Sequence, residues 1–227
     1  MSDFAGGVGF IVHHFSFLLQ KAFEQLQLSG AALAIALVIA LPAGILLGHL
    51  HRGANIAIGG SIVGRALPSL VLIGVFLTVL GIGFVNNMVA LAVLATGPIL
   101  TNAFDGVDRV DRDAVESARG MGMTGTQVLR QVELPLALPL IFTGIRVAAV
   151  TVVATAPIAA IAGGGGLGDV IVNQASYRFS GVIGASICVM ALSALVFLGL
   201  VAAEAAVTPR GVKRTRVGID PRRKEHV

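Results

Sequence analysis

The sequence predicts an all-α membrane protein with five transmembrane helices, an outside N-terminus and a cytoplasmic C-terminus. Of its 227 residues 56% are hydrophobic and only 12% are charged, whereas soluble domains carry about 25% charged residues. The chain also has long runs without charge, and its basic residues are distributed very unevenly along the sequence. Its 29 glycines are typical of transmembrane helices.

Residues 1–28 are expected to form an extracytoplasmic amphipathic segment that lies along the membrane surface. The start, MSDFAGGVGF, has neither a basic region nor a small-residue cleavage site, so no cleavable signal is expected. A sixth span between residues 10 and 28 is an alternative, but five polar residues interrupt it: His13, His14, Gln20, Lys21 and Glu24. Adjacent histidines do not share a helical face, so no metal site is expected there.

Charge-free runs place the five spans within a transmembrane domain at residues 29–207. No Asp, Glu, Lys or Arg occurs from residue 66 to 104, which is too long a run for one helix of about 20 residues. The stretch GIGFVNN at 81–87 divides it, because glycine and asparagine favour turns. The expected spans are 29–50, 56–80, 87–104, 141–162 and 181–204.

The basic residues orient these spans. Seven arginines between residues 52 and 146 and seven Lys or Arg in the tail at 208–227 fall on one side of the membrane. Only Lys21 and Arg178 fall on the other side. Because positive loops stay in the cytoplasm, the tail and the polar segment 105–135 are predicted to be cytoplasmic. The tail anchors this topology, and a specific contact with anionic lipid is the alternative.

The polar segment 105–135 is expected to hold two short amphipathic helices. Asp111 is a suitable N-cap for a helix at about 112–120, and Gly120 and Gly122 end it, because glycine accepts a left-handed conformation. Thr124 and Gln127 have capping-box spacing for the second helix, which is expected to end at Pro135. The predicted apolar faces are Ala114, Val115, Ala118 and Met121 on the first helix and Val128, Leu129 and Val132 on the second.

This segment has three interpretations: a plain helix on the membrane surface, a DNA-binding helix-turn-helix, or a docking site for a cytoplasmic partner. The DNA-binding interpretation is the weakest, because the segment is tethered between spans and rich in acidic residues that repel phosphates. These residues are Asp105, Asp108, Asp111, Asp113 and Glu116. No nucleic acid is therefore expected as a partner.

The segment resembles the EAA loop of ABC-importer permeases. In that pattern E-A-A is followed by three residues, a glycine, nine residues and I-x-L-P. At these positions the chain has Glu116, Ser117, Ala118, Gly122, Val132, Leu134 and Pro135. Only Ser117 and Val132 depart from the pattern, and both changes are small. The resemblance implies a MetI-like permease architecture in which this loop couples the spans to a cytoplasmic ATPase.

A wider resemblance covers about residues 30–205 and points to the osmoprotectant branch, whose substrates are glycine betaine, choline, carnitine and proline betaine. It is carried by residues 118–146 together with IAGGGGLGDVI at 161–171. The branch usually has a Q-T-I-P-S stretch in the second span, where this chain keeps Pro68 and Ser69 but has Arg65 and Ala66. The stretch GPILTNAF at 97–104 keeps Pro98 and Asn102 of a P-P-I-L-R-N-T stretch.

The resemblance implies two ATP-binding subunits, a second permease chain, identical or related, and an extracytoplasmic substrate-binding protein. The candidate substrate pathway comprises Pro68, Ser69, Asn102, Thr151 and Thr155. The glycines of GGGGLG are expected to form an outer turn, or alternatively a gate: Gly163, Gly164, Gly165, Gly166 and Gly168. Although GGGGLG matches G-x-G-x-x-G, no strand precedes it, so a dinucleotide site is not expected.

The residues also argue for an external energy source and a separate binding protein. No carboxylate is expected in mid-membrane, where ion-coupled carriers often place one, and Glu204 is expected at the cytoplasmic end of the last span. No residue is suited to ATP hydrolysis, so the chain is not an enzyme and needs no cofactor. With no Trp, one Tyr and scattered Phe, a tight aromatic cage for a quaternary ammonium is not expected. The alternatives are a permease for another small solute such as methionine, a scaffold or signalling subunit, and an ion channel.

Overall fold

The computed structural model describes residues 2–51, 59 and 68–207, and within them every regular element is a helix. In chain order these are α1 (Ser2–His13), α2 (Phe15–His49), α4 (Ser69–Leu80), α5 (Phe84–Asp108), α6 (Arg112–Gly120), α7 (Gly125–Val128), the π turn η1 (Leu129–Glu133), α8 (Leu134–Thr155), the 3-10 segment η2 (Ala156–Ala162), α9 (Leu167–Val172) and α10 (Gln174–Val207).

The predicted all-α membrane class is confirmed. Within the described residues, four helical stretches are long and apolar enough to cross a membrane: Phe15–His49, Phe84–Asp108, Gly125–Ala162 and Gln174–Val207. The helix α4 is a shorter apolar helix that covers the second half of the span expected at 56–80. Most of the first half of that span and the tail at 208–227 lie outside the described residues.

The first long helix differs from its expected bounds. α2 runs without a break from Phe15 to His49, so the boundary expected between residues 28 and 29 falls inside it. Three residues around this point, Gln25, Leu28 and Ser29, are buried in the bundle. Polar side chains in this stretch therefore partly face other helices, which local polarity alone does not reveal. At 1.5 Å per residue the helix is about 52 Å long, well above the roughly 30 Å of the hydrocarbon core.

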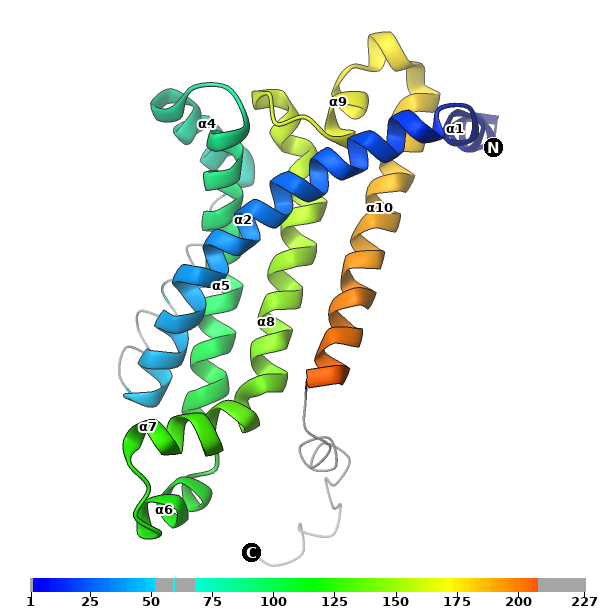
Figure 1. Ribbon diagram of the computed structural model, residues 1–227. Helices are drawn as coiled ribbons and strands as arrows, with labels where there is room; N and C mark the ends of the chain where they lie inside the picture. The colour runs from blue at the N-terminus through cyan, green and yellow to red at the C-terminus, as the bar shows by residue number, and fades with distance from the viewer. Residues whose placement is uncertain (1, 52–58, 60–67, 208–227) are drawn as a thin grey trace, which may run out of the picture.

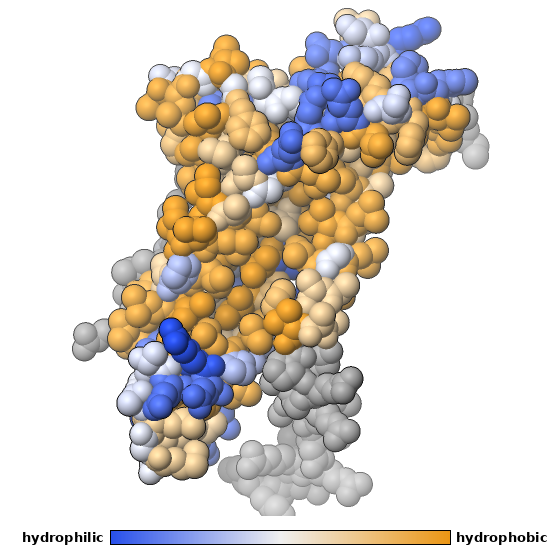
Figure 2. Space-filling view, in the orientation of Figure 1, coloured by the Kyte–Doolittle hydropathy of each residue, from blue (hydrophilic) through white to orange (hydrophobic). Residues whose placement is uncertain are grey.

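The long helices form a bundle with a loop region at each end (Figure 1). α5 packs between α2, which crosses it obliquely, and α8, and α10 packs against α8. The short helices α6 and α7 lie at one end of the bundle, whereas α1 and α9 lie at the other. In Figure 2 a broad hydrophobic band covers the middle of the molecule, and the hydrophilic residues gather at the two ends. This is the surface expected of a protein whose solvent is lipid.

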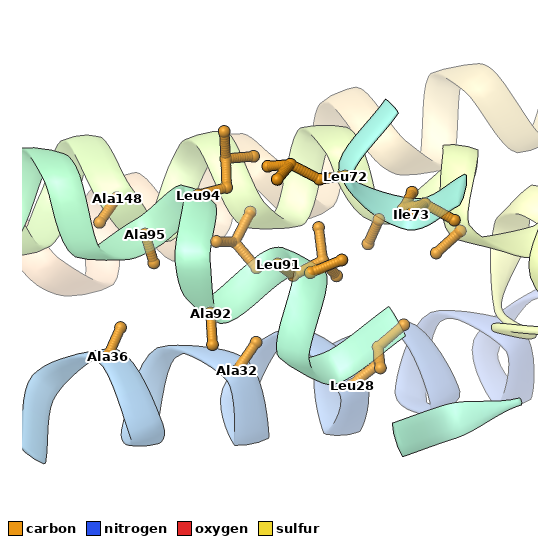
Figure 3. Close-up of a cluster of buried hydrophobic side chains, with 14 of the residues drawn as sticks. Leu28, Ala32, Ala36, Leu72, Ile73, Leu91, Ala92, Leu94, Ala95 and Ala148 are labelled. Atoms are coloured by element: carbon orange, nitrogen blue, oxygen red, sulfur yellow. The ribbon is translucent and has the colours of Figure 1, made fainter. Parts of the chain in front are cut away.

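Small residues bring α2 and α5 close together. Ala32, Ala36 and Ala40 of α2 are fully buried and belong to one core with Leu91, Ala92 and Ala95 of α5 (Figure 3). Further along, the backbone of Gly44 approaches α5 so closely that an added Cβ would lie 2.7 Å from the Leu100 carbonyl oxygen. Lipid offers no hydrophobic drive for helices to associate, so close van der Waals contact through small residues stabilises the pair instead.

We predict that Gly44→Ala destabilises the bundle, because its methyl group has no space beside the backbone of α5. Overpacking of this kind costs about 1–3 kcal/mol, which should appear as a lower midpoint of thermal unfolding in detergent. Gly30→Ala is the matched control, since Gly30 lies on the same helix and a Cβ added there would meet no described atom within 4 Å. Equal midpoints for the two variants would contradict the close approach of α2 and α5.

Candidate functional site

The α6–α7 loop turns at a glycine corner. The side chain of Asp111 caps α6 by accepting a hydrogen bond from the Asp113 N–H at 3.0 Å, as predicted. After α6, the N–H of Gly122 donates to the Arg119 carbonyl and the N–H of Met123 to the Ala118 carbonyl, at 2.9 and 3.2 Å. This is the Schellman pattern of a helix end. Gly122 has a φ of +87°, whereas Gly120 is not in the left-handed region, so the turn requires glycine only at position 122.

The second helix of the loop begins as predicted. The Thr124 N–H donates to Oε1 of Gln127 at 2.8 Å, which is the backbone half of a capping box. The two helices pack on each other through Val115, Ala118 and Val128, which are buried. One residue of the predicted apolar face behaves differently: Met121 lies at the corner with 73% of its surface exposed. The loop therefore has its own small core and an apolar side chain at its tip.

The residues that match the EAA pattern divide into two groups. In the first group, Glu116 and Ser117 are exposed on α6 and Gly122 is exposed at the corner, whereas Ala118 is buried beneath it. The other three residues, which lie at the junction with α8, are half-buried: Val132, Leu134 and Pro135. The exposed residues of the first group and Met121 form the tip of the loop, and the second group forms the attachment of this tip to the bundle.

The expectation that the second helix ends at Pro135 is wrong. α7, η1 and α8 form one helical stretch that continues from Gly125 to Ala162. Pro135 lies in the first turn of α8, directly after the π turn Leu129–Glu133. A proline removes one backbone donor and its ring crowds the preceding turn, but the wider π turn relieves this crowding. The loop is thus joined to the long helix α8 by continuous helix.

The structure also shows a buried ion pair that the sequence pattern did not reveal. Glu133, the variable residue of the V-x-L-P stretch, is only 1% exposed, and its Oε2 lies 2.6 Å from Nδ1 of His49. This distance is that of a hydrogen bond between the imidazole and the carboxyl group. The two residues are 84 positions apart in the chain, and no local signal relates them.

A cavity of about 240 Å³ opens beside this ion pair. Its polar lining combines two carboxylates, two guanidinium groups and a histidine. The lining residues are His51, Val107, Val110, Arg112, Val115, Glu116, Arg119 and Glu133. A cavity with both signs of charge is not suited to a purely anionic ligand.

At the opposite end, the glycine run forms an ordered turn between η2 and α9. Gly163, Gly165 and Gly166 all have positive φ values of 72–77°, which other residues adopt only with strain. Gly168 lies against the Pro157 carbonyl oxygen, which would be 2.3 Å from an added Cβ. The predicted turn is therefore present, and its glycines are needed for both conformation and close packing.

Three hydrogen bonds support the end of α8, the 3-10 segment η2 and the glycine turn. Pro157 has no N–H, so it leaves the Val153 carbonyl without its helical donor, and Nε2 of Gln25 donates to that carbonyl at 2.9 Å. Nδ2 of Asn87 donates to the Ala162 carbonyl at 3.1 Å. The N–H of Gly166 donates to Oε2 of Glu24 at 3.1 Å. Polar residues of α2 and α5 thus support the end of α8 before η2, the end of η2 and the turn.

Ion pairs reinforce this attachment. Nζ of Lys21 lies 2.8 Å from a carboxylate oxygen of both Glu24 and Asp169, so it links α2 to α9. Nearby polar atoms lack partners among the described residues: both amide atoms of Asn86 and Oε1 of Gln25 are buried without a hydrogen bond. Buried polar groups in this state are expected to bind water or to find partners in another conformation.

The structure does not gather the five predicted pathway residues at one point. Pro68 and Ser69 lie at the start of α4. On α5, Asn102 donates to the Pro98 carbonyl and packs against Gly144 of α8. Thr151 lines a groove of about 300 Å³ that also contains Arg146 and Phe197, and Thr155 is the last residue of α8. These residues lie on three helices and at different levels.

Arg146 and Glu204 form an ion pair between α8 and α10. The guanidinium of Arg146 also lies over the ring of Phe197, 5.3 Å from its centroid, which is a cation–π contact. The carboxylate of Glu204, at the end of the last long helix, is thus bound to a neighbouring helix. This pairing removes the cost of an unpaired charge at the helix surface.

The chain is similar to a known family of transport proteins. Residues 36–209 match the family described as binding-protein-dependent transport system inner membrane component. The glycine betaine/carnitine/choline transport system permease protein OpuCB of Bacillus subtilis (strain 168) is 36% identical over 197 residues, which are 86% of this chain and 91% of the relative. The carnitine transport permease protein OpuCB of Listeria monocytogenes is 38% identical over 202 residues, 88% of this chain and 93% of the relative.

The fold is also similar to that of solved structures. A chain from a structure of inward-facing conformations of the MetNI methionine ABC transporter superposes with a TM-score of 0.73. The similarity covers 85% of this chain and 96% of that chain, at 24% sequence identity. At this identity the match supports the predicted MetI-like architecture and says nothing of ligand.

We predict that Gln25→Leu lowers the midpoint of thermal unfolding, because it leaves the Val153 carbonyl buried without a donor. Loss of such a partner costs about 1–3 kcal/mol. Gln27→Leu is the control, because Gln27 is exposed on the same helix and has the same side chain. A midpoint equal to that of the control would mean that the carbonyl next to Pro157 does not depend on Gln25.

Proposed function

The chain belongs to the family of binding-protein-dependent transport system inner membrane components, and from this premise we propose that it is the permease subunit of an ATP-driven importer of compatible solutes. The substrate class is a small quaternary ammonium compound of the betaine, choline or carnitine type, because the relatives that match most of the chain carry these substrates in their names. A separate binding protein delivers the substrate, and a separate ATPase supplies the energy.

One structural observation carries this proposal: the α6–α7 loop projects from one end of the bundle and continues without a break into α8 (Figure 1). Its tip exposes Met121 and the polar residues around Glu116, and hydrophilic residues gather at this end of the molecule in Figure 2. An exposed apolar side chain within a polar rim is typical of a protein contact. The motif match at this loop supports its role as the contact with the ATPase, on the cytoplasmic side.

The assembly that we propose contains two permease chains and two ATP-binding subunits. In the part of the chain that the structure describes, side chains fill the core between α2, α5 and α8 (Figure 3). This packing leaves no enclosed path through that core, so a second permease chain, identical or related, would complete the path. The five pathway residues, Pro68, Ser69, Asn102, Thr151 and Thr155, are its proposed lining.

The outer turn is proposed as the gate that faces the binding protein. Its glycines at 163–166 and 168 connect η2 to α9. Asn87 of α5 donates to the Ala162 carbonyl before the turn, and Glu24 of α2 accepts from the Gly166 N–H within it. A gate requires a segment with a defined position that a limited set of polar contacts maintains. These contacts and the orphaned polar atoms of Asn86 support this assignment.

Weak substrate binding by the permease itself follows from its aromatic residues. The ring of Tyr177 is stacked on Phe17 at 5.7 Å between centroids and lies edge-on to Phe10 at 6.3 Å. These rings cover each other's faces, so they do not form an open cage for an ammonium group. Affinity is therefore assigned to the binding protein, and the permease provides a path.

Uptake of radiolabelled choline into cells that express the complete system tests the substrate. We expect betaine and carnitine to compete, and we expect uptake to require both the ATPase and the binding protein. Methionine is the control competitor, because transport of another small solute such as methionine is the alternative. Competition by methionine alone, or uptake without the ATPase, would contradict the proposal. Recovery of the permease with no ATP-binding subunit would favour the scaffold alternative.

We predict that Gly122→Val prevents docking or coupling of the ATPase. Valine at a φ of +87° is strained by about 1–2 kcal/mol or more, so the corner between α6 and α7 changes shape while the long helices remain intact. The measurements are substrate-stimulated ATP hydrolysis in the reconstituted complex and recovery of the ATPase on purification.

The matched control for this experiment is Gly120→Val, because Gly120 has an ordinary helical conformation and an added Cβ would meet no described atom within 4 Å. Glu116→Lys should have a milder effect, since one exposed charge pair contributes little. Full coupling by a well-expressed Gly122→Val protein would show that the loop is an ordinary surface loop.

A further inference from the structure

Glu133 occupies an unusual place for a carboxylate. It is the last residue of the π turn that joins the α6–α7 loop to α8, and only 1% of its side chain is exposed. Burial of an unpaired charge is very unfavourable, so a buried carboxylate requires a partner with good geometry. Its Oε2 has such a partner in Nδ1 of His49 at 2.6 Å, whereas its Oε1 has none among the described residues.

His49 reaches this position from the far end of α2. It is the last residue of that helix, and its ring lies between Glu133 and the start of α7, where an added Cβ on Gly125 would be 3.7 Å from its Nε2. α2 makes few other contacts with α7 or η1, although it packs extensively on α5. The His49–Glu133 ion pair is therefore the principal polar link between α2 and the loop within the described residues.

A second His–carboxylate pair at the same end provides a comparison. Nδ1 of His51 lies 2.8 Å from Oδ1 of Asp108 at the end of α5, but these side chains are 45% and 36% exposed. Water competes for both partners of an exposed pair, and such pairs contribute little. The His49–Glu133 pair is far less exposed, at 17% and 1%, so water competes less for it, and its hydrogen bond fixes both the distance and the direction between α2 and η1.

We propose that the His49–Glu133 ion pair transmits displacement of the α6–α7 loop to α2, so that Glu133 and His49 are positioning residues for coupling. Movement of the loop reaches α8 through the continuous helix. α2 also packs directly against α8, and Gln25 donates to the Val153 carbonyl of α8 at the opposite end of the bundle, but beside the loop it is the His49–Glu133 pair that joins α2 to η1. With the pair, the end of α2 follows η1, and α2 also carries Glu24, which accepts a hydrogen bond from Gly166 of the glycine turn at the opposite end. This inference rests on the proposed function of the loop.

The test uses the reconstituted complex of permease, ATPase and binding protein, with radiolabelled choline transported per ATP hydrolysed as the readout. Glu133→Leu removes the acceptor at nearly constant side-chain volume. We expect the ATPase to be recovered at the level found with the unmodified chain and basal hydrolysis to change less than about twofold, while the transport ratio falls about tenfold, which is a difference of about 1.4 kcal/mol in coupling. An unchanged transport ratio would overturn the proposal.

The double variant H49L/E133L separates transmission from stability. An apolar pair in place of a buried ion pair generally restores folding, but it provides a contact that can slide rather than a directional hydrogen bond. We expect a normal midpoint of thermal unfolding with a transport ratio that remains low. Recovery of both quantities would show that the ion pair only stabilises the fold, and would overturn the proposal even where the single variant does not fold.

The matched control is Asp108→Asn, which weakens the exposed His51 pair at the same end of α2. It should change the transport ratio by less than about twofold, and an equally large loss would show that the effect is not specific to the buried pair. The unmodified complex distinguishes the two levels of inference. If it shows no ATP-dependent uptake, the proposed function fails, whereas normal uptake combined with full coupling in Glu133→Leu refutes only the role of the ion pair.

Discussion

Lipid supplies no hydrogen bonds, so a membrane-spanning chain must satisfy each backbone group from within. This constraint explains where the polar side chains of the protein lie. Prolines interrupt the long helices, and each removes a donor from a carbonyl one turn earlier. Where Pro157 does so, Gln25 supplies the missing donor across the bundle. Where η2 ends, the Asn87 side chain and the Gly83 N–H of another segment both donate to the Ala162 carbonyl. Several buried polar side chains in this bundle thus form hydrogen bonds to backbone groups, and these bonds help to define the position of the glycine turn.

Small residues are the second feature that holds the long helices together. Alanines on α2 and the glycines 44 and 48 allow α5 to approach within backbone contact. The tight packing of α2, α5 and α8 makes a rigid centre, whereas the two ends are built from short helices and turns. The rigid centre and the polar attachments at its ends explain how a loop at one end and a turn at the other can belong to one mechanical unit.

The features that the sequence predicts well are those that depend on local patterns. Charge-free runs indicate the spans, and the caps at Asp111 and Thr124 and the corner at Gly122 follow from short-range chemistry that the structure confirms. The start of α2 does not follow from local polarity, because the partner of Gln25 lies 128 positions away. The pairing of Glu133 with His49 cannot be predicted from local patterns either, because the two residues lie 84 positions apart. Pro135 is expected from the sequence to end a helix because no sequence pattern identifies the π turn that precedes it and allows the helix to continue.

The π turn Leu129–Glu133 also determines how α8 is rotated about its own axis. A π turn contains one residue more than an α turn of the same rise, and in a helix of 3.6 residues per turn one residue corresponds to about 100° around the axis. The five residues Leu129–Glu133 therefore set which side of α8 faces α5. Were the turn to revert to α-helix with the loop held fixed, Gly144 would rotate away from Asn102 and a bulkier side chain would meet α5. The rotation of α8 about its own axis is thus determined at the π turn that attaches it to the loop.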